Sequence, residues 1–326
     1  ANMHEIGINP DSSNMNYGVV RNPHDLGHDA GGSSSGSAAA VAAGSCPVAI
    51  GADGGGSVRV PAAHCGLVGL KATFGRISEA GAAPLCWSVA HVGPIGPTVA
   101  DVVLAYALMA GPDERDPVST YQPPVSVAGW NRGDLDGVVL GIFPDWFDHC
   151  TPAIRQTCRA LLGRLEAAGA TVREVAIPEL DLMRIAHALT LLSEMAASMD
   201  NLGAKAADLS PSTRVNFALG RAATARDYVQ AQRMRTRALA HFAKAFAEVD
   251  VLVSPTTAVT APRIPDGGLS DGWSDLSVVT EVMRYVFPAN LTGHPALSVP
   301  AGYDPAGLPI GLHLMGRHWE EHLLFR

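Results

Sequence analysis

The sequence lacks the features of several large protein classes. No uninterrupted apolar run approaches the roughly 20 residues of a membrane-spanning helix, and no secretory signal stands at the start of the chain. Its 326 residues include 23 basic and 31 acidic side chains, which gives a formal net charge of −8. Nucleic-acid binding requires a basic surface that neutralises phosphates. We therefore expect no nucleic-acid partner.

Cysteines are few, and metal-binding patterns are missing. The five cysteines are an odd number without C-x-x-C spacing, which predicts a reducing cytoplasm rather than a disulfide framework. No H-E-x-x-H occurs. His24 and His28 are four residues apart, but Pro23 and Gly27 disfavour the helix that would bring both rings to one ion. We expect no metal site.

Nucleotide-binding motifs are also incomplete. No G-x-x-x-x-G-K-[ST] is present, and the glycines at 54–56 are followed by Ser57, Val58 and Arg59, where a dinucleotide fingerprint needs another glycine. A phosphate cradle is the main non-hydrolase interpretation of these glycines. It would need the lysine of a phosphate-binding loop or the acidic residue of a dinucleotide site, and the chain provides neither, so we expect no cofactor.

The apolar pattern predicts an α/β fold. With 47% hydrophobic and 17% charged residues, the chain is large enough to bury a sizeable core. Predicted strands at 137–142 and 171–177 flank a predicted helix at 152–168, an order that implies a parallel strand pair with a covering helix. We expect a mixed sheet covered by helices on both faces. Further elements are expected as helices at 38–43, 99–110, 181–199 and 224–246, strands at 47–50 and 249–254, a short helix and strand within 61–70, an apolar helix at 278–291, and a rigid turn at 93–97.

Two glycine and serine clusters carry the chemistry, at 31–37 and at 54–57. Each lies between a polar loop and an apolar segment, where glycines allow several backbone N–H groups to point at one place. Such a group of donors is the raw material of an oxyanion hole. Three glycines precede Ser57, which makes it the best nucleophile candidate. Serine-rich loops are also common helix caps, which is the alternative interpretation of the first cluster.

A rival serine motif lies within the first cluster. Residues 32–36 fit G-x-S-x-G, the nucleophile elbow of hydrolases that follows a buried strand. The preceding residues, 22–29, are polar and broken by proline and glycine, which disfavours this interpretation.

Residues 31–76, GGSSSGSAAAVAAGSCPVAIGADGGGSVRVPAAHCGLVGLKATFGR, resemble the signature region of the amidase signature family. Within that family the chain is most similar to the plant-type fatty acid amide hydrolases. The resemblance covers almost the whole chain and includes the segments at 2–7, 16–18, 21–25, 178–184, 254–257, 283–286, 290–293 and 307–311.

The resemblance implies a Ser-cisSer-Lys triad. Ser57 matches the nucleophile, and Ser33 matches the bridging serine on a cis peptide bond. A neutral lysine acts as the base through Ser33. The oxyanion donors would be the backbone amides of Gly54, Gly55, Gly56 and Ser57. Asp53, Arg59 and Ser34 would support the site, and we expect Asp53 and Arg59 to be buried rather than to form an ordinary surface ion pair.

The resemblance also implies the substrate. We expect hydrolysis of a carboxamide through an acyl-enzyme, with a fatty acyl amide such as an N-acylethanolamine as the small-molecule partner. Thr256, Met283, Tyr285 and Phe287 are expected to line the pocket. A homodimer and a peripheral membrane contact for a lipid substrate stay open.

The lysine base departs from the family pattern. Lys71, Lys205 and Lys244 are the only lysines, and none lies in a matching context. We therefore expect residues 1–326 to be one amidase signature domain that lacks the N-terminal segment with the lysine and the C-terminal helix. The alternatives are a general aliphatic or aryl amidase, an amidotransferase component of the A type, or a catalytically inert fragment.

Overall fold

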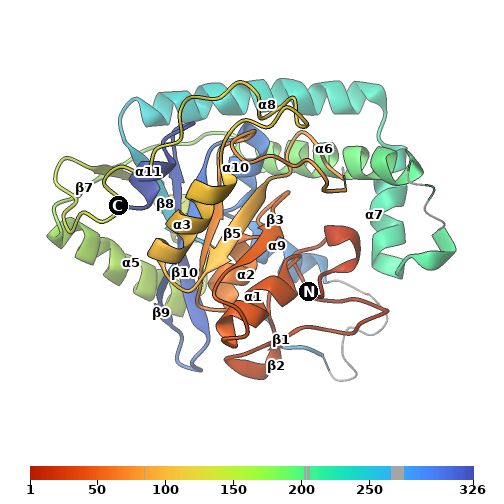
Figure 1. The fold of residues 1–326 in the computed structure, drawn as a ribbon, viewed down its shortest axis with the longest axis horizontal. Helices are drawn as coiled ribbons and strands as arrows, with labels where there is room; N and C mark the ends of the chain where they lie inside the picture. Colours follow the sequence, from red (N-terminus) through yellow and green to blue (C-terminus); the bar gives the residue numbers. More distant parts are fainter. Residues whose placement is uncertain (84, 202, 204–205, 266–274) are drawn as a thin grey trace.

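An eight-stranded mixed sheet forms the centre of the computed structural model (Figure 1). The structure describes residues 1–83, 85–201, 203, 206–265 and 275–326. The strand order in the sheet is β3-β5-β4-β9-β10-β8-β6-β7. Its strands are β3 (Ala49–Ala52), β4 (Val68–Lys71), β5 (Val92–Gly96), β6 (Val139–Ile142), β7 (Thr171–Glu174), β8 (Val251–Pro255), β9 (Ala296–Tyr303) and β10 (Pro309–Gly316).

The sheet changes from antiparallel to parallel along its width. All neighbours from β3 to β8 are antiparallel, whereas β6 pairs in parallel with both β8 and β7. The predicted parallel pair is therefore confirmed, with α5 (Pro152–Ala167) as the connecting helix. A small second sheet pairs β1 (Arg21–Asn22) with β2 (Asp25–Asp29).

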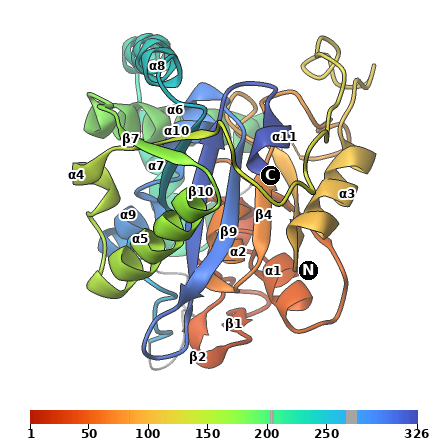
Figure 2. The ribbon, with the colours of Figure 1, turned by 90° about the vertical axis from the view of Figure 1, so that its left-hand side faces the viewer.

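Helices cover both faces of the large sheet, as expected (Figures 1 and 2). The core on one face includes side chains of α3, α5 and α11, and the core on the other includes side chains of α6, α8 and α10. No helix within the described ranges is both long and apolar enough to cross a membrane. The remaining bounds are α1 (Ser35–Ala42), α2 (Arg59–His64), α3 (Val99–Met109), α4 (Pro144–Phe147), α6 (Leu180–Asn201), α7 (Pro211–Ala222), α8 (Ala225–Phe246), α9 (Leu276–Met283), α10 (Phe287–Thr292) and α11 (Glu321–Leu324), with short 3₁₀ helices at Glu5–Gly7 and Ala206–Asp208.

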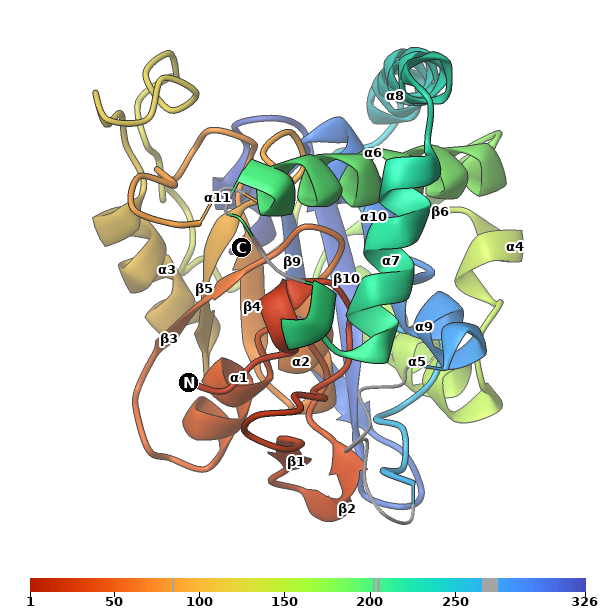
Figure 3. The ribbon, with the colours of Figure 1, turned by 90° about the vertical axis from the view of Figure 1, so that its right-hand side faces the viewer.

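The N-terminal segment lies beside α7 (Figure 3). The Asn9 side-chain amide donates to the Ser212 hydroxyl at 2.9 Å, and the Ser210 N–H donates to the Glu5 carboxylate at 2.8 Å. These contacts attach the N-terminal segment to the start of α7. Residues 6–10 also line a pocket together with Ser33 and Ala52, the last residue of β3.

Local signals explain the helix ends. Thr98 caps α3 by accepting the Asp101 N–H. Thr224 and Asp227 form a reciprocal capping box at the start of α8. The apolar stripe of α8 is buried in the core beside α6.

Two sequence-based expectations are wrong. Residues 93–97 do not form a turn, because β5 occupies this stretch and lies between β3 and β4. A Cβ on Gly93 would lie 2.0 Å from the Leu70 carbonyl oxygen, so the glycine permits a close strand approach rather than a bend. The apolar stretch at 278–291 is also not one helix, since α9 ends at Met283 and α10 begins at Phe287.

Substituting Gly93 by alanine should destabilise the protein by roughly 1–3 kcal/mol, because the added methyl group overpacks against backbone. The matched control is Gly163→Ala in α5, where no atom lies within 4 Å of the added Cβ. That control should stabilise the protein by about 0.5–1 kcal/mol, since alanine is the better helix former. Urea unfolding of both variants measures the difference. Equal free energies of unfolding would contradict the close approach at β5.

Candidate active site

The two glycine and serine clusters meet where β3 ends and α2 begins. The Ser34 N–H donates to the Ser57 carbonyl at 3.2 Å. The Ser34 hydroxyl accepts from the Ala52 N–H at 3.2 Å and donates to the Ala52 carbonyl at 3.3 Å. Ser33 and Ser57 line one pocket, which we call the serine pocket. The structure therefore brings together the two serines that the sequence singles out, with Ser34 linking their clusters.

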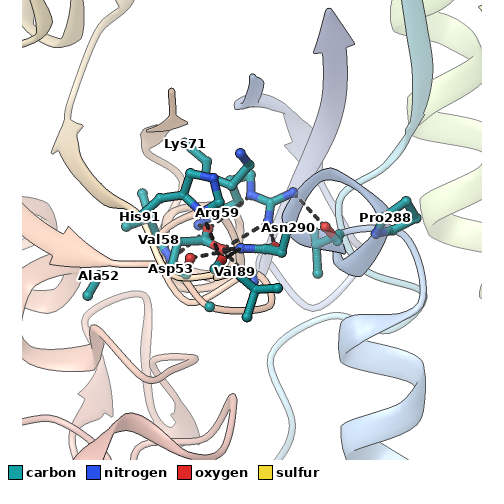
Figure 4. A network of polar contacts seen from close by, with 12 residues as sticks. Ala52, Asp53, Val58, Arg59, Lys71, Val89, His91, Pro288 and Asn290 are labelled. Carbon is teal, nitrogen blue, oxygen red and sulfur yellow. Dashed lines mark hydrogen bonds and ion pairs between the residues drawn. The ribbon is translucent and has the colours of Figure 1, made fainter. Parts of the chain in front are cut away.

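A buried carboxylate organises the loop that follows β3 (Figure 4). Asp53 and Arg59 have no exposed surface, and an ion pair of 2.9 Å joins them. The Asp53 carboxylate also accepts the backbone N–H groups of Gly56 at 2.6 Å and Val58 at 3.1 Å. Asn290 donates to the carbonyl and to the carboxylate of Asp53, at 2.7 and 2.9 Å. Asp53 and Arg59 are thus buried, as predicted, and they shape this loop.

The ion pair stays charged despite its burial. Burial alone would raise the pKa of Asp53, but the Arg59 charge and hydrogen bonds from Arg59 and Asn290 hold that pKa well below its usual range. Arg59 also donates to the Val286 carbonyl at 2.9 Å and contacts His313 Nε2 at 2.8 Å. Burial and the Arg59 charge lower the pKa of His313 well below its usual value, so its neutral ring accepts from Arg59.

The backbone N–H groups of this loop differ in whether they have a hydrogen-bond acceptor. Within the described residues, the N–H groups of Gly54, Gly55 and Ser57 donate to no other group, and these three residues line the serine pocket. The Gly56 N–H is committed to the Asp53 carboxylate, so the expectation that includes Gly56 among the oxyanion donors is corrected. Three free amides beside a serine hydroxyl can stabilise an oxyanion that forms on a carbonyl.

His187 of α6 supports the same turn from outside. Its Nε2 lies 2.8 Å from the Gly54 carbonyl oxygen. Burial lowers the pKa of His187 to about 4, so a neutral ring donates this hydrogen bond. The sequence carries no signal for this contact, because a single histidine in an amphipathic helix is most often a core residue.

The turn that carries Ser33 is packed against the N-terminal segment. The Gly32–Ser33 peptide bond is cis, as the resemblance predicts. A Cβ on Gly32 would lie 2.0 Å from the Asp11 carbonyl oxygen, so only glycine permits this approach. The His4 N–H donates to the Ser33 carbonyl at 3.3 Å. His4 and Asp11, which lie outside both glycine and serine clusters, therefore help to determine where Ser33 lies.

Asp29, at the end of β2, holds the same turn and was missed by sequence analysis. Its buried carboxylate accepts the Gly31 N–H at 2.6 Å, the Ser12 hydroxyl at 2.6 Å and the Ser12 N–H at 3.1 Å. Burial and the nearby Asp11 carboxylate raise the pKa of Asp29 to about 7. An aspartate before a glycine cluster resembles an ordinary turn residue, so the sequence pattern does not predict that the Asp29 carboxylate is buried.

The wall of the serine pocket is mainly apolar and draws on α6 and α9. Met283 lines it, as expected, and its methyl group packs toward Gly55. The other apolar side chains longer than alanine and proline are Met3, Ile6, Ile8, Leu85, Val92, Leu191 and Met195. Leu191 and Met195 were missed because their helical spacing is typical of core residues.

Three expected wall residues lie elsewhere. Thr256 is fully buried and its hydroxyl bonds the Ser298 hydroxyl at 2.8 Å. The Tyr285 hydroxyl points to the His149 carbonyl at 2.6 Å, and Phe287 packs in the core beside α6 and α8. None of these three lines the serine pocket.

None of the described lysines lines the serine pocket. Lys71 is fully buried on β4, and its Nζ donates to the Ala72 carbonyl at 3.0 Å. Burial and the Arg59 charge lower its pKa well below the usual value. Lys244 lies on α8, and Lys205 lies outside the described residues. Within the described ranges, no group of three or more His, Cys, Asp or Glu side chains is placed to hold a metal ion.

Arg59→Met should destabilise the protein by about 3–5 kcal/mol, because it leaves the Asp53 carboxylate buried without its cation. Arg115→Met is the matched control, since Arg115 is 79% exposed and pairs with Asp113 at the surface. The control should change stability by less than about 1 kcal/mol. Denaturant unfolding compares the two. A loss below about 1 kcal/mol in Arg59→Met would show that the buried pair does not hold the loop.

Asp29→Asn should change how stability depends on pH. A folded-state pKa near 7, above the unfolded value near 4, makes the Asp29 contribution greatest below pH 4 and removes it as pH rises through 7. The free energy of unfolding of the Asn variant, relative to that of the wild type, should therefore increase between about pH 5 and pH 8. The increase should be on the order of a few kcal/mol. Asp25→Asn on the same strand is the control and should follow the wild type. Parallel curves for Asp29→Asn and the wild type would refute the raised pKa.

Comparisons with known proteins agree with this geometry. The family model described as Amidase matches residues 1–325. The fatty acid amide hydrolase of Medicago truncatula is 43% identical over 333 residues, which cover 100% of this chain and 55% of that protein. The chain therefore spans about half the length of the curated relatives of this kind that it matches.

Solved structures show the same fold. A component of the glutamyl-tRNA(Gln) amidotransferase of Thermotoga maritima superposes with a TM-score of 0.88 at 29% identity, over 100% of this chain and 71% of that one. A bacterial aryl acylamidase of the amidase signature enzymes superposes with a TM-score of 0.86 at 26% identity, over 98% and 68%. The match of the family model to nearly every residue, together with these likenesses, means that the chain belongs to the amidase signature family.

Proposed function

We propose that this chain carries the nucleophile and the oxyanion-binding turn of an enzyme that hydrolyses carboxamide bonds. One observation carries the proposal: the free amides of Gly54, Gly55 and Ser57 line the same pocket as the Ser33 and Ser57 hydroxyls. A nucleophile next to preorganised donors is the arrangement that acyl transfer needs.

The proposed reaction proceeds in two steps. Ser57 Oγ forms a bond to the amide carbon, while its proton moves to Ser33 and from there to a base. The carbonyl oxygen becomes an oxyanion that accepts hydrogen bonds from the free amides. The C–N bond then breaks, the amine leaves with the returned proton, and an ester to Ser57 remains. Water attacks this ester in the second step, which releases the carboxylic acid.

The base is the one member of the triad that the described residues do not supply. The resemblance implies a lysine, and neither Lys71 nor Lys244 lines the serine pocket. We propose that this lysine belongs to a part of the protein outside residues 1–326. The greater length of the fatty acid amide hydrolases supports this. Without a base, the expected loss of rate is roughly 10²–10⁴-fold.

A fatty acyl amide is the proposed substrate. The apolar wall formed by Ile8, Leu191, Met195 and their neighbours suits an acyl chain, and the 43% identity to a fatty acid amide hydrolase supports the same class. The alternatives are a general aliphatic or aryl amide, or glutamine in an amidotransferase, which the likeness to the Thermotoga maritima protein keeps open.

A fluorophosphonate probe followed by peptide mapping tests the nucleophile in the full-length protein. The label should lie on Ser57, and Ser57→Ala should lose the label together with roughly 10³-fold or more of the amide hydrolysis rate. Ser37→Ala is the control, because that hydroxyl belongs to the first cluster and donates to the Ile50 carbonyl at the surface. A label on Ser33 or Ser34, or full activity in Ser57→Ala, would overturn the assignment.

Product analysis separates the substrate classes. The full-length protein is incubated with an N-acylethanolamine, a simple aryl amide and glutamine. Ethanolamine release at the highest kcat/KM supports the fatty acyl amide, whereas faster release of an arylamine or of ammonia from glutamine supports the alternatives.

A further inference from the structure

A second cavity lies against the serine pocket, and the proposed reaction does not use it. Its volume is about 210 Å³, against about 90 Å³ for the serine pocket. Five residues line both cavities: Glu79, Ala82, Ala83, Ala90 and Val92. The two cavities therefore adjoin along alanine and valine side chains and the Glu79 side chain, and Ser57 lines one of them.

The two cavities differ in polarity. Both cavities have many apolar side chains on their walls. The serine pocket adds methionine, leucine and isoleucine, whereas the second cavity adds Thr73, His91 and Asp116 together with the Phe74 and Trp87 rings. An amide substrate also has two unlike ends, an acyl group and an amine group, on either side of the carbon that Ser57 attacks. We call the second cavity the polar cavity. Its chemistry suits the amine end, and the apolar wall suits the acyl end.

Glu79 is the charged side chain at the border. It is the only carboxylic acid among the described residues that line the serine pocket. Its N–H donates to Asp116 Oδ2 at 2.9 Å, and Asp116 Oδ1 accepts the Val118 N–H at 3.1 Å. Glu79 is half-buried, and within the described ranges no protein group donates to its carboxyl oxygens, so a bound donor can contact them without displacing a protein partner. Burial and the Asp116 charge raise the pKa of Glu79 to about 7, and a hydrogen bond from a bound donor would shift that pKa in the opposite direction.

No cation of the polar cavity, among the residues that the structure describes, neutralises Glu79. Arg115 lines the cavity, but its guanidinium is 79% exposed and bonded to Asp113. His91 is 4% exposed, its Nδ1 lies 2.8 Å from the Val89 carbonyl, and its Nε2 has no partner among those residues. Burial and the Lys71 charge hold the pKa of His91 well below its usual value, so the ring is neutral. The cavity is thus acidic and has aromatic rings on its wall, which favours ligand groups that donate hydrogen bonds or carry positive charge.

We propose that Glu79 determines specificity for the amine half of the substrate, by binding a hydroxyl or ammonium group carried on that half. The inference rests on the proposed function of the serine pocket and deepens it. The substrate class is an N-acyl amide whose amine portion bears a hydrogen-bond donor. The donor reaches the Glu79 carboxyl at the border of the two cavities while the acyl chain lies on the apolar wall.

Three amides of one fatty acid provide the test: N-(2-hydroxyethyl), N-(2-aminoethyl) and N-propyl. They are nearly equal in size and differ in the terminal group. Wild-type full-length protein should prefer each donor-bearing amide over the propyl amide by roughly tenfold or more in kcat/KM, the scale of a hydrogen bond to a charged group. Glu79→Leu should lose both preferences, mainly through weaker turnover of the donor-bearing amides. Glu79→Gln should keep most of the hydroxyl preference and lose the ammonium preference.

Glu114→Gln is the matched control, because Glu114 is an exposed acid on the connection between α3 and β6, next to Arg115 of the polar cavity, and lines neither cavity itself. It should keep both preferences. Unchanged preferences in Glu79→Leu would overturn the proposal, as would a wild-type preference for the propyl amide.

A binding measurement separates this proposal from the proposed function. Calorimetry with the Ser57→Ala protein gives the dissociation constants of the same three amides without turnover. If the wild type hydrolyses none of them, the amidase proposal fails. The Glu79 proposal then stands only if the donor-bearing amides bind at least about tenfold more tightly than the propyl amide and lose that advantage in Glu79→Leu.

Discussion

The buried Asp53 carboxylate is the constraint on which the rest of the site depends. A carboxylate without solvent is costly unless a cation and hydrogen bonds replace the lost water. Arg59 and Asn290 supply part of the replacement, and the amides of Gly56 and Val58 supply the rest. Since those amides turn inward to the carboxylate, Gly54, Gly55 and Ser57 keep theirs free. The Asp53 carboxylate therefore binds some N–H groups of the loop, and the others are left without a protein acceptor.

The large sheet makes this arrangement possible. Arg59 lies on α2, Asn290 on α10 and His313 on β10, and these segments meet because β4, β9 and β10 are neighbours. The Ser33 turn depends on a different set of contacts, from Asp29 and from the backbone of Asp11. Two serines that are well separated in the chain are thus positioned by two independent supports, which the Ser34 hydrogen bonds join.

The side chains around Ser33 and Ser57 differ in polarity from one side to the other. Side chains of α6, α9 and the N-terminal segment make an apolar wall, whereas the connection after β4 contributes Glu79 and the polar cavity beyond it. In the proposed reaction the substrate carbonyl lies at the free amides, and under the Glu79 proposal its two halves extend into these two regions.

The sequence by itself determined the α/β class, most helices and strands, and the pair Ser33 and Ser57, because periodicity and glycine clusters are local signals. It also indicated the burial of Asp53 and Arg59 through the family resemblance. Only the tertiary structure decided that Gly93 belongs to a strand, that the Gly56 N–H binds the Asp53 carboxylate, and that Thr256, Tyr285 and Phe287 lie away from the pocket. The same holds for Asp29, His187 and Glu79. Each of these depends on a group that is distant in the chain or on which way one N–H or side chain points, and no local pattern encodes that direction.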